Sequence, residues 1–139
     1  MTTKEYLQEI YKISRRIKRL QEIRAEIRAD LYSVRSAPLD SDKVQSSVSD
    51  DRMAKLVAKV DWIERDIIDE LDVLTERRKV ICGQIEQMTD ERYKTILHDR
   101  YVLCHKWERI AVDMDLDIRW VYRLHGEALK SFENLYFDH

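Results

Sequence analysis

Apolar residues alternate at steps of four and three along two long stretches of this chain. The first series is Tyr6, Ile10, Ile13, Ile17, Leu20, Arg24, Ile27, Leu31 and Val34. The second series is Met53, Val57, Val60, Glu64, Ile67, Leu71, Leu74, Arg78, Ile81, Ile85 and Met88. A sustained seven-residue repeat keeps one narrow stripe of a helix facing a partner helix, so it is typical of coiled coils. The two series therefore predict long helices over residues 3–34 and 52–87.

The segment between these helices, residues 35–51, contains the only proline together with several serines and aspartates. We expect a loop there, with Ser49 or Asp50 as the cap of the second helix. A loop of this length allows an antiparallel return, which would bring Arg24 and Glu64 together across the seam. The seam is equally compatible with helices that pair between two chains in a homodimer, and the sequence leaves both arrangements open.

The composition agrees with long amphipathic helices. The 139 residues include two glycines and one proline, and 37% of them are charged, which disfavours sheets and tight turns. Thr2 and Glu5 have the spacing of a capping box at the start of the first helix. Neither a membrane-spanning run nor a secretory signal is evident. We therefore expect a cytoplasmic protein that contacts no membrane, with Cys82 and Cys104 as reduced thiols.

Residues 106–135 carry the spacing of a helix-turn-helix. The positions that predict its inner side and its turn are Ile110, Ala111, Met114, Leu116, Val121, Leu124 and Ala128. The small side chain of Ala111 lets the two helices cross closely. Asp115 stands where such turns often have glycine, and aspartate tolerates the left-handed backbone that the turn requires. Asp117 is a good N-cap for the second helix.

The outer side of that second helix predicts a binding stripe. It consists of Arg119, Tyr122, Arg123, Gly126 and Lys130. These positions share one helical face, and outward arginines with a glycine that allows close approach suit a DNA major groove. Similar helix pairs also occur in proteins that never bind DNA. The net charge of −2 is unusual for a DNA-binding protein, so we expect useful affinity to need a dimer or a partner protein.

A preceding segment would pack Ile96, Leu97, Tyr101 and Leu103 against this motif. The stretch TDERYKTILHDRYVLCHKWERIAVDMDLDIRWVYRLHGEALKSFENL resembles region 4 of sigma-70-type factors, the domain that reads the promoter −35 element. Nearly the whole chain resembles small phage and prophage transcriptional regulators related to the RinA and ArpU activators. The fold class expected is all-α, with a long antiparallel helical hairpin (coiled coil) over residues 1–88. A C-terminal sigma-region-4-like helix-turn-helix bundle over residues 89–139 would follow and bind DNA.

The resemblance implies roles for individual residues. The start of the recognition helix, which reads bases in region-4-like domains, falls here on Ile118, Arg119, Tyr122 and Arg123. An arginine can donate two hydrogen bonds to a guanine, which makes Arg119 and Arg123 the main candidates. Contacts to phosphates would come from Lys106, Trp107 and Arg109. Trp120 lies beside the inner face, where we expect it to pack.

The function implied is that of a phage-encoded, sequence-specific transcriptional regulator. It would bind double-stranded promoter DNA in the bacterial host cytoplasm and act as an activator with host RNA polymerase. Because the chain has no room for a second domain that opens the −10 region, it could not initiate transcription alone. Two alternatives stay open. One is a helical interaction module that binds the polymerase or a phage partner without DNA contact, and the other is a DNA-packaging recognition subunit that assembles as a ring.

The sequence predicts no enzyme, no catalytic residue and no cofactor. Two glycines exclude a phosphate-cradling loop, and no serine or cysteine has an evident base partner. His98, Cys104 and His105 are close in sequence. They do not share a helical face in ligand geometry, so we predict no metal site.

Overall fold

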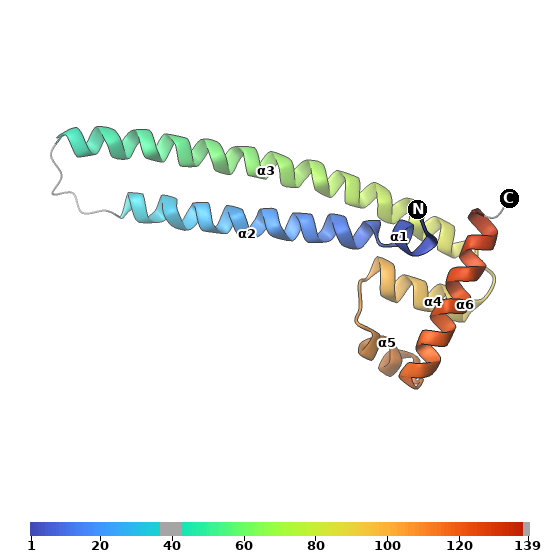
Figure 1. Cartoon of the computed structure of the whole chain (residues 1–139). Coiled ribbons are helices and arrows are strands. Elements are labelled where there is room, and N and C mark those ends of the chain that lie inside the picture. Colours follow the sequence, from blue (N-terminus) through green and yellow to red (C-terminus); the bar gives the residue numbers. More distant parts are fainter. Residues whose placement is uncertain (37–42, 138–139) are drawn as a thin grey trace. The chain divides into compact units, whose positions relative to one another are not determined.

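The computed structural model describes residues 1–36 and 43–137, with the side chains of residues 43–49 outside the description. Every regular element in these ranges is a helix, which confirms the all-α class. The elements are α1 (Thr3–Leu7), α2 (Glu9–Arg35), α3 (Lys43–Glu86), α4 (Glu91–Leu97), the π-helix η1 (His98–Val102), α5 (Trp107–Met114) and α6 (Ile118–Tyr136) (Figure 1). No described helix combines the length and the apolarity that crossing a membrane requires.

The chain forms two compact units, which we call the hairpin unit and the bundle unit. The hairpin unit is Arg15–Asp72, and the bundle unit combines Met1–Ser14 with the chain from Val73 onward. The boundary predicted between residues 88 and 89 therefore falls inside the bundle unit. The N-terminal part of α2 and the C-terminal part of α3 therefore belong to the same unit as the helix-turn-helix.

In the hairpin unit, α2 and α3 pack antiparallel within one chain. The Arg16 guanidinium lies 3.1 Å from a carboxylate oxygen of Glu70, and Arg28 pairs with Glu64. Ile17, from the first predicted series, is buried, and its later members are half-buried. The predicted hairpin is thus present, and its seam closes inside a single molecule.

The seam of α3 differs from the predicted series at alternate positions. Leu56 and Ile63 are 8% and 2% exposed, whereas Val57 and Leu71 are 38% and 43% exposed. The predicted series and the series buried in the structure both have heptad spacing, and they share every seventh position from Met53 onward. The spacing alone therefore could not decide which of the two series would be buried. The observed register moves the Glu64 carboxylate to the edge of the seam, where water and Arg28 reach it, and so avoids the cost of burying a charge.

The predicted pairing of Arg24 with Glu64 is wrong. Glu64 bonds to Arg28, one helical turn further along α2, and Arg24 is half-buried in the seam. A long side chain can place its methylene groups against apolar neighbours while its charged end reaches water. Arg24 therefore contributes packing to the seam rather than an ion pair with Glu64.

The predicted start of the second helix also needs correction. α3 begins at Lys43 rather than at residue 52, so Ser49 and Asp50 lie inside the helix and do not cap it. The predicted loop over residues 35–51 is correspondingly shorter, and residues 37–42 of it lie outside the described residues. Residues 43–51 contain neither glycine nor proline, so nothing in them stops the helix from beginning at Lys43.

The first predicted helix is interrupted once. The capping box at Thr2 and Glu5 is confirmed, but α1 ends at Leu7, and its C-cap Gln8, with ψ −5°, separates it from α2. Hydrogen bonds continue on both sides of this residue, at 2.9 Å from Gln8 N to Lys4 O and 3.0 Å from Lys12 N to Gln8 O. Leu7, which is outside the heptad series, is fully buried on the same side as Ile10.

The bundle unit has a continuous apolar core. Its largest fully buried side chains are Phe132, Leu7, Ile10, Ile81, Ile85, Ile96, Leu97, Ile110 and Val121. Polar contacts close its rim: the Tyr136 hydroxyl donates to Gln84 O at 2.6 Å, and the Tyr6 hydroxyl donates to Gln84 Oε1 at 2.5 Å. Arg77 Nε lies 3.1 Å from a Glu9 carboxylate oxygen. The core thus joins residues from both ends of the chain.

The π-helix explains one wrong prediction about packing. Leu103 N donates to His98 O at 2.9 Å, a bond that spans five residues and widens the turn. The buried face therefore falls on Tyr101 and Val102, and Leu103 is 58% exposed instead of packing against the next helices. Ile96, Leu97 and Tyr101 are buried as predicted.

Candidate nucleic-acid interface

The turn between α5 and α6 has the geometry that the sequence predicted. Asp115 adopts the left-handed conformation, with φ 55° and ψ 47°, and ends α5. Leu116 N donates to Ala111 O at 3.0 Å, and the Asp117 side chain accepts from Arg119 N at 2.8 Å to start α6. These bonds satisfy backbone groups that the ends of both helices leave unpaired. They hold α5 and α6 at a defined angle.

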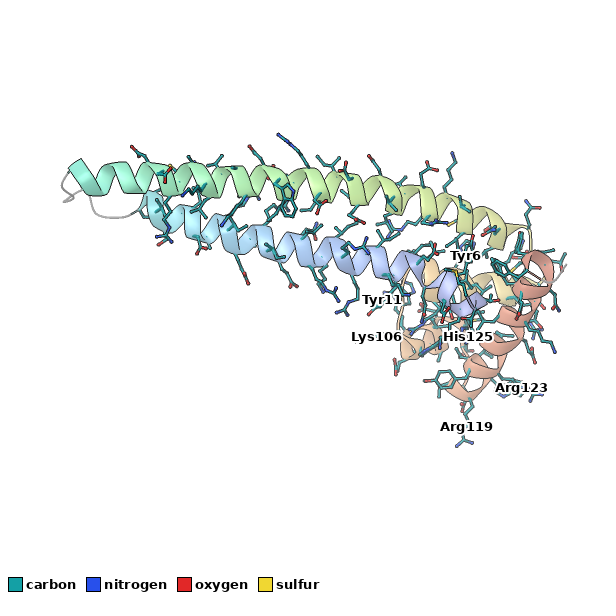
Figure 2. The ribbon with its side chains drawn as sticks, turned by 45° about the horizontal axis from the view of Figure 1, so that its top comes forward. Tyr6, Tyr11, Lys106, Arg119, Arg123 and His125 are labelled. Carbon is teal, nitrogen blue, oxygen red and sulfur yellow. The ribbon has the colours of Figure 1, made fainter. Side chains whose placement is uncertain are left out.

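α6 is strongly two-sided. Its buried residues are Val121, Leu124, His125, Ala128 and Phe132. Its exposed residues include the whole predicted stripe, which is Arg119, Tyr122, Arg123, Gly126 and Lys130. Figure 2 shows Arg119 and Arg123 reaching outward from the first turns of this helix. The inner side of α6 is therefore fixed in the core while the stripe faces solvent.

The two arginines have different surroundings. Arg119 has no ion pair among the described side chains. Arg123 Nε lies 3.8 Å from Glu127 Oε1, and the Arg123 guanidinium lies 5.3 Å from the centre of the Trp120 ring. Both contacts are exposed and weak in water. Arg119 can bind a ligand at once, and Arg123 must first leave Glu127.

Trp120 does not pack in the core, contrary to prediction. Its side chain is 58% exposed. Successive helical residues are turned by about 100°, so the position before the buried Val121 lies on the flank of α6 rather than on its inner side. The flank presents Trp120 to solvent with Arg123 above it.

The three predicted phosphate contacts lie in or next to α5. Lys106 is exposed at the N-cap and makes no side-chain capping bond. Arg109 is exposed and pairs with Asp113 across one turn at 3.6 Å. Trp107 is half-buried, with Arg100 4.4 Å above its ring and Tyr122 and His125 against its edges. Lys106 and Arg109 therefore remain available, whereas Trp107 mainly connects α5, η1 and α6.

A buried polar pair supports this aromatic cluster. The Tyr101 hydroxyl and His125 Nε2 are hydrogen-bonded at 2.6 Å. Burial, together with the positive charges of Lys4 and Arg100, lowers the pKa of His125 to about 4. Burial also raises the pKa of Tyr101 to about 12. Both groups are thus uncharged at neutral pH, and they fix the middle of α6 to η1 without a buried charge.

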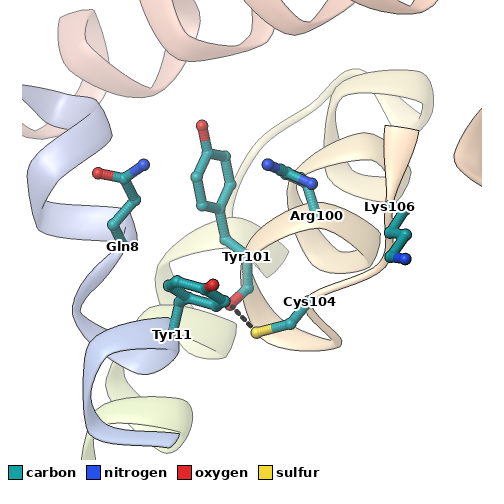
Figure 3. A pocket seen from close by; sticks show the side chains of 6 residues that line it. All are labelled: Gln8, Tyr11, Arg100, Tyr101, Cys104 and Lys106. Atoms are coloured by element: carbon teal, nitrogen blue, oxygen red, sulfur yellow. Dashed lines mark hydrogen bonds between the residues drawn. The ribbon is translucent and has the colours of Figure 1, made fainter. Parts of the chain in front are cut away.

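A cavity of about 290 Å³ lies on another side of η1 in the bundle unit (Figure 3). It is lined by Gln8, Tyr11, Arg100, Tyr101, Cys104 and Lys106. The Cys104 thiol donates to Tyr101 O at 3.7 Å. Burial raises the pKa of the Cys104 thiol, although Arg78 and Arg100 oppose this effect. The thiol therefore stays protonated at neutral pH and is a poor nucleophile.

The structure separates the predicted binding residues into two groups. The exposed group contains the α6 stripe with Lys106 and Arg109, and half-buried Ile118 begins α6 beside it. Trp107 belongs to the packing group.

No family model, curated protein or solved structure matches this chain.

Proposed function

We propose that this chain is a sequence-specific DNA-binding transcriptional regulator whose α6 lies in the major groove. One observation carries the proposal. Arg119, Tyr122 and Arg123 occupy the exposed side of a helix whose opposite side is anchored in the bundle core. An α-helix fits the major groove, and rigid presentation of a few long side chains is what base recognition requires.

The side chains of the stripe have the chemistry for reading base edges. Each guanidinium can donate two parallel hydrogen bonds to O6 and N7 of a guanine. Gly126 supports a close approach of the DNA backbone. A Cβ built at this position meets nothing within 4 Å, so the fold itself does not require glycine there. A glycine inside a helix costs about 0.5–1 kcal/mol relative to alanine, and an approaching partner would account for it.

The charges of this region predict modest affinity for one copy. Residues 89–139 contain eight basic and ten acidic side chains. Lys106, Arg109 and Lys130 would neutralise phosphates, but Arg109 and Arg123 would first have to leave their weak pairs with Asp113 and Glu127. Tight binding would therefore use a second DNA-binding unit or a protein partner. The resemblance of the sequence to phage activators indicates that this protein partner is host RNA polymerase.

The test is selection of duplexes from a random library, followed by affinity measurements on the enriched sequence. Arg119→Ala and Arg123→Ala should each weaken binding by about 1–3 kcal/mol, the usual value of one bidentate base contact. Arg65→Ala is a matched control, because Arg65 is an exposed arginine of the hairpin unit. The proposal fails if no duplex is enriched, or if all three variants bind like the unaltered protein.

A second candidate, a protein-binding module, is favoured by a specific observation. Val112, Leu116 and Trp120 are large apolar residues exposed in α5, the turn and α6. Exposed apolar residues of this kind are common at protein interfaces, tryptophan above all. Trp120→Ala distinguishes the two functions. A loss of polymerase binding with unchanged DNA affinity would assign this patch to a partner, whereas equal loss of DNA affinity would assign it to the DNA interface.

A further inference from the structure

Three potential metal ligands meet at the junction of η1 and α5 in the bundle unit. They are Asp99 in η1, His105 in the connection and Asp113 in the last turn of α5. One ligand atom from each residue lies within 4.8 Å of the other two. The sequence grouped His105 with His98 and Cys104 instead, but His98 Nε2 bonds to Glu86 at 2.8 Å.

The backbone holds two of these groups in place. Cys104 has a positive φ of 58°, which turns the chain back over the π-helix. His105 N then donates to Asp99 O at 2.8 Å, and His105 O accepts from Arg100 Nη1 at 3.0 Å. These two bonds anchor His105 beside Asp99. Asp113 comes from α5, which packs against η1.

In the described part of the chain, His105 Nδ1 has no hydrogen-bond partner, the Asp99 carboxylate makes no ion pair, and Asp113 has only a loose one. His105 Nδ1 is buried and has no hydrogen-bond partner among the described residues. Asp99 is half-buried, and its carboxylate makes no ion pair in the described part of the chain. Asp113 pairs only loosely with Arg109, at 3.6 Å. Two carboxylates and an imidazole thus surround a position where a cation would satisfy all three.

We propose that Asp99, His105 and Asp113 bind a divalent first-row transition metal ion, with Zn²⁺ as the best fit. Neutral imidazole nitrogen and carboxylate oxygen are both ordinary Zn²⁺ ligands, at about 2.0–2.2 Å. Ligand atoms around a tetrahedral ion lie roughly 3.4 Å apart, so the side chains would rotate inward and Asp113 would release Arg109. Water completes the coordination. Mg²⁺ and Ca²⁺ prefer oxygen ligands alone, which the imidazole does not provide.

The ion would have two effects on the bundle unit. It would link η1, the connection and α5, and so stabilise the folded state in proportion to its occupancy. It would also neutralise two carboxylates close in the chain to Lys106 and Arg109. The metal site does not depend on the proposed function, because the ion binds to the chain alone.

Titration calorimetry of the full chain with ZnCl₂ tests the site directly. We expect one ion per chain, and His105→Gln, Asp99→Asn and Asp113→Asn should each weaken binding by more than roughly tenfold, since even indirect partners of a ligand contribute that much. His98→Gln and Asp115→Asn remove the same groups outside the cluster and should bind normally. Equal binding by site and control variants, or no binding of Zn²⁺ at all, would overturn the proposal.

Cobalt absorption identifies the ligands independently of affinity. Co²⁺ held by nitrogen and oxygen gives weak visible bands, whereas a thiolate ligand adds an intense charge-transfer band in the ultraviolet. We expect no such band, and we expect Cys104→Ser to bind Co²⁺ like the unaltered protein. A thiolate band that Cys104→Ser abolishes would assign the ion to the cysteine and exclude the proposed site. Asp113 is exposed, so Asp113→Asn keeps the test valid if the other variants fold poorly.

Discussion

At the scale of single residues, the difference between Arg119 and Arg123 has a measurable consequence. Glu127 both pairs with Arg123 and accepts a hydrogen bond from the Tyr93 hydroxyl at 3.3 Å. In the proposed complex, its carboxylate would compete with DNA for Arg123 and would repel phosphates. The stripe therefore contains one arginine that is ready to bind and one that is restrained.

Glu127→Gln should raise DNA affinity by about two- to fivefold, because an exposed ion pair is worth up to about 1 kcal/mol. Fluorescence anisotropy on the selected duplex measures this change. Glu22→Gln removes an exposed carboxylate from the hairpin unit and serves as the control. Weaker binding by Glu127→Gln would mean that the pair orients Arg123 for DNA instead of restraining it.

A second residue-scale prediction concerns His125 and pH. The pKa of His125 is about 4 in the fold against an ordinary 6.5, so the unfolded chain takes up this proton first as the pH falls. The stability that neutral His125 provides is complete above pH 6.5 and is lost as the pH approaches 4. The difference corresponds to roughly 3 kcal/mol. Urea denaturation between pH 7 and pH 4 should show a steeper loss for the unaltered protein than for His125→Gln, and equal slopes would contradict the assignment.

At the scale of elements, the turn between α5 and α6 depends on one left-handed residue. Asp115 has φ 55°, a conformation that is strained for residues other than glycine. Asp115→Gly should therefore raise the free energy of unfolding by about 0.5–1 kcal/mol, after the greater freedom of glycine in the unfolded chain is deducted. Asp115→Asn removes the charge of the side chain but keeps its size, and it should change the free energy of unfolding little. A less stable glycine variant in chemical denaturation would show that the aspartate side chain itself holds the turn.

The long helices illustrate what sequence spacing can and cannot predict. The heptad series predicted both helices, because helix formation and apolar burial depend on local pattern. The length of the loop allowed their antiparallel pairing, but the sequence did not decide between pairing within one chain and pairing between two chains. The choice of Leu56 and Ile63 over Val57 and Glu64 depended on where Glu64 could meet Arg28 and water. Contacts between the two packed helices determine which residues of α3 are buried, so the sequence pattern of one helix is not enough to predict them.

The candidate interface shows the same division. Spacing predicted the left-handed Asp115, the cap at Asp117 and the exposed stripe, because each follows from local geometry. The half-buried position of Trp107 depends on Arg100, which the π-helix presents. The cluster of Asp99, His105 and Asp113 likewise depends on the turn at Cys104. Contacts between separate segments could not be derived from periodicity.

At the scale of the whole molecule, closure of the hairpin within one chain limits assembly. The apolar seam of α2 and α3 is occupied within the chain, so we propose that pairing between chains does not use it. We predict a particle of one or two chains by sedimentation velocity. A DNA-packaging recognition subunit would form a ring. A measured mass of eight or more chains would support that alternative and contradict a regulator that acts as one or two chains.

The central claim is that α6 reads base pairs through its two arginines, and the sequence preference of single variants tests it most directly. Duplex selection should be repeated with Arg119→Ala and with Arg123→Ala. Each variant should lose its guanine preference at one base pair, at a different position for each arginine, and keep the rest of the site. Identical preferred sequences for both variants and the unaltered protein would show that these guanidinium groups do not contact the bases.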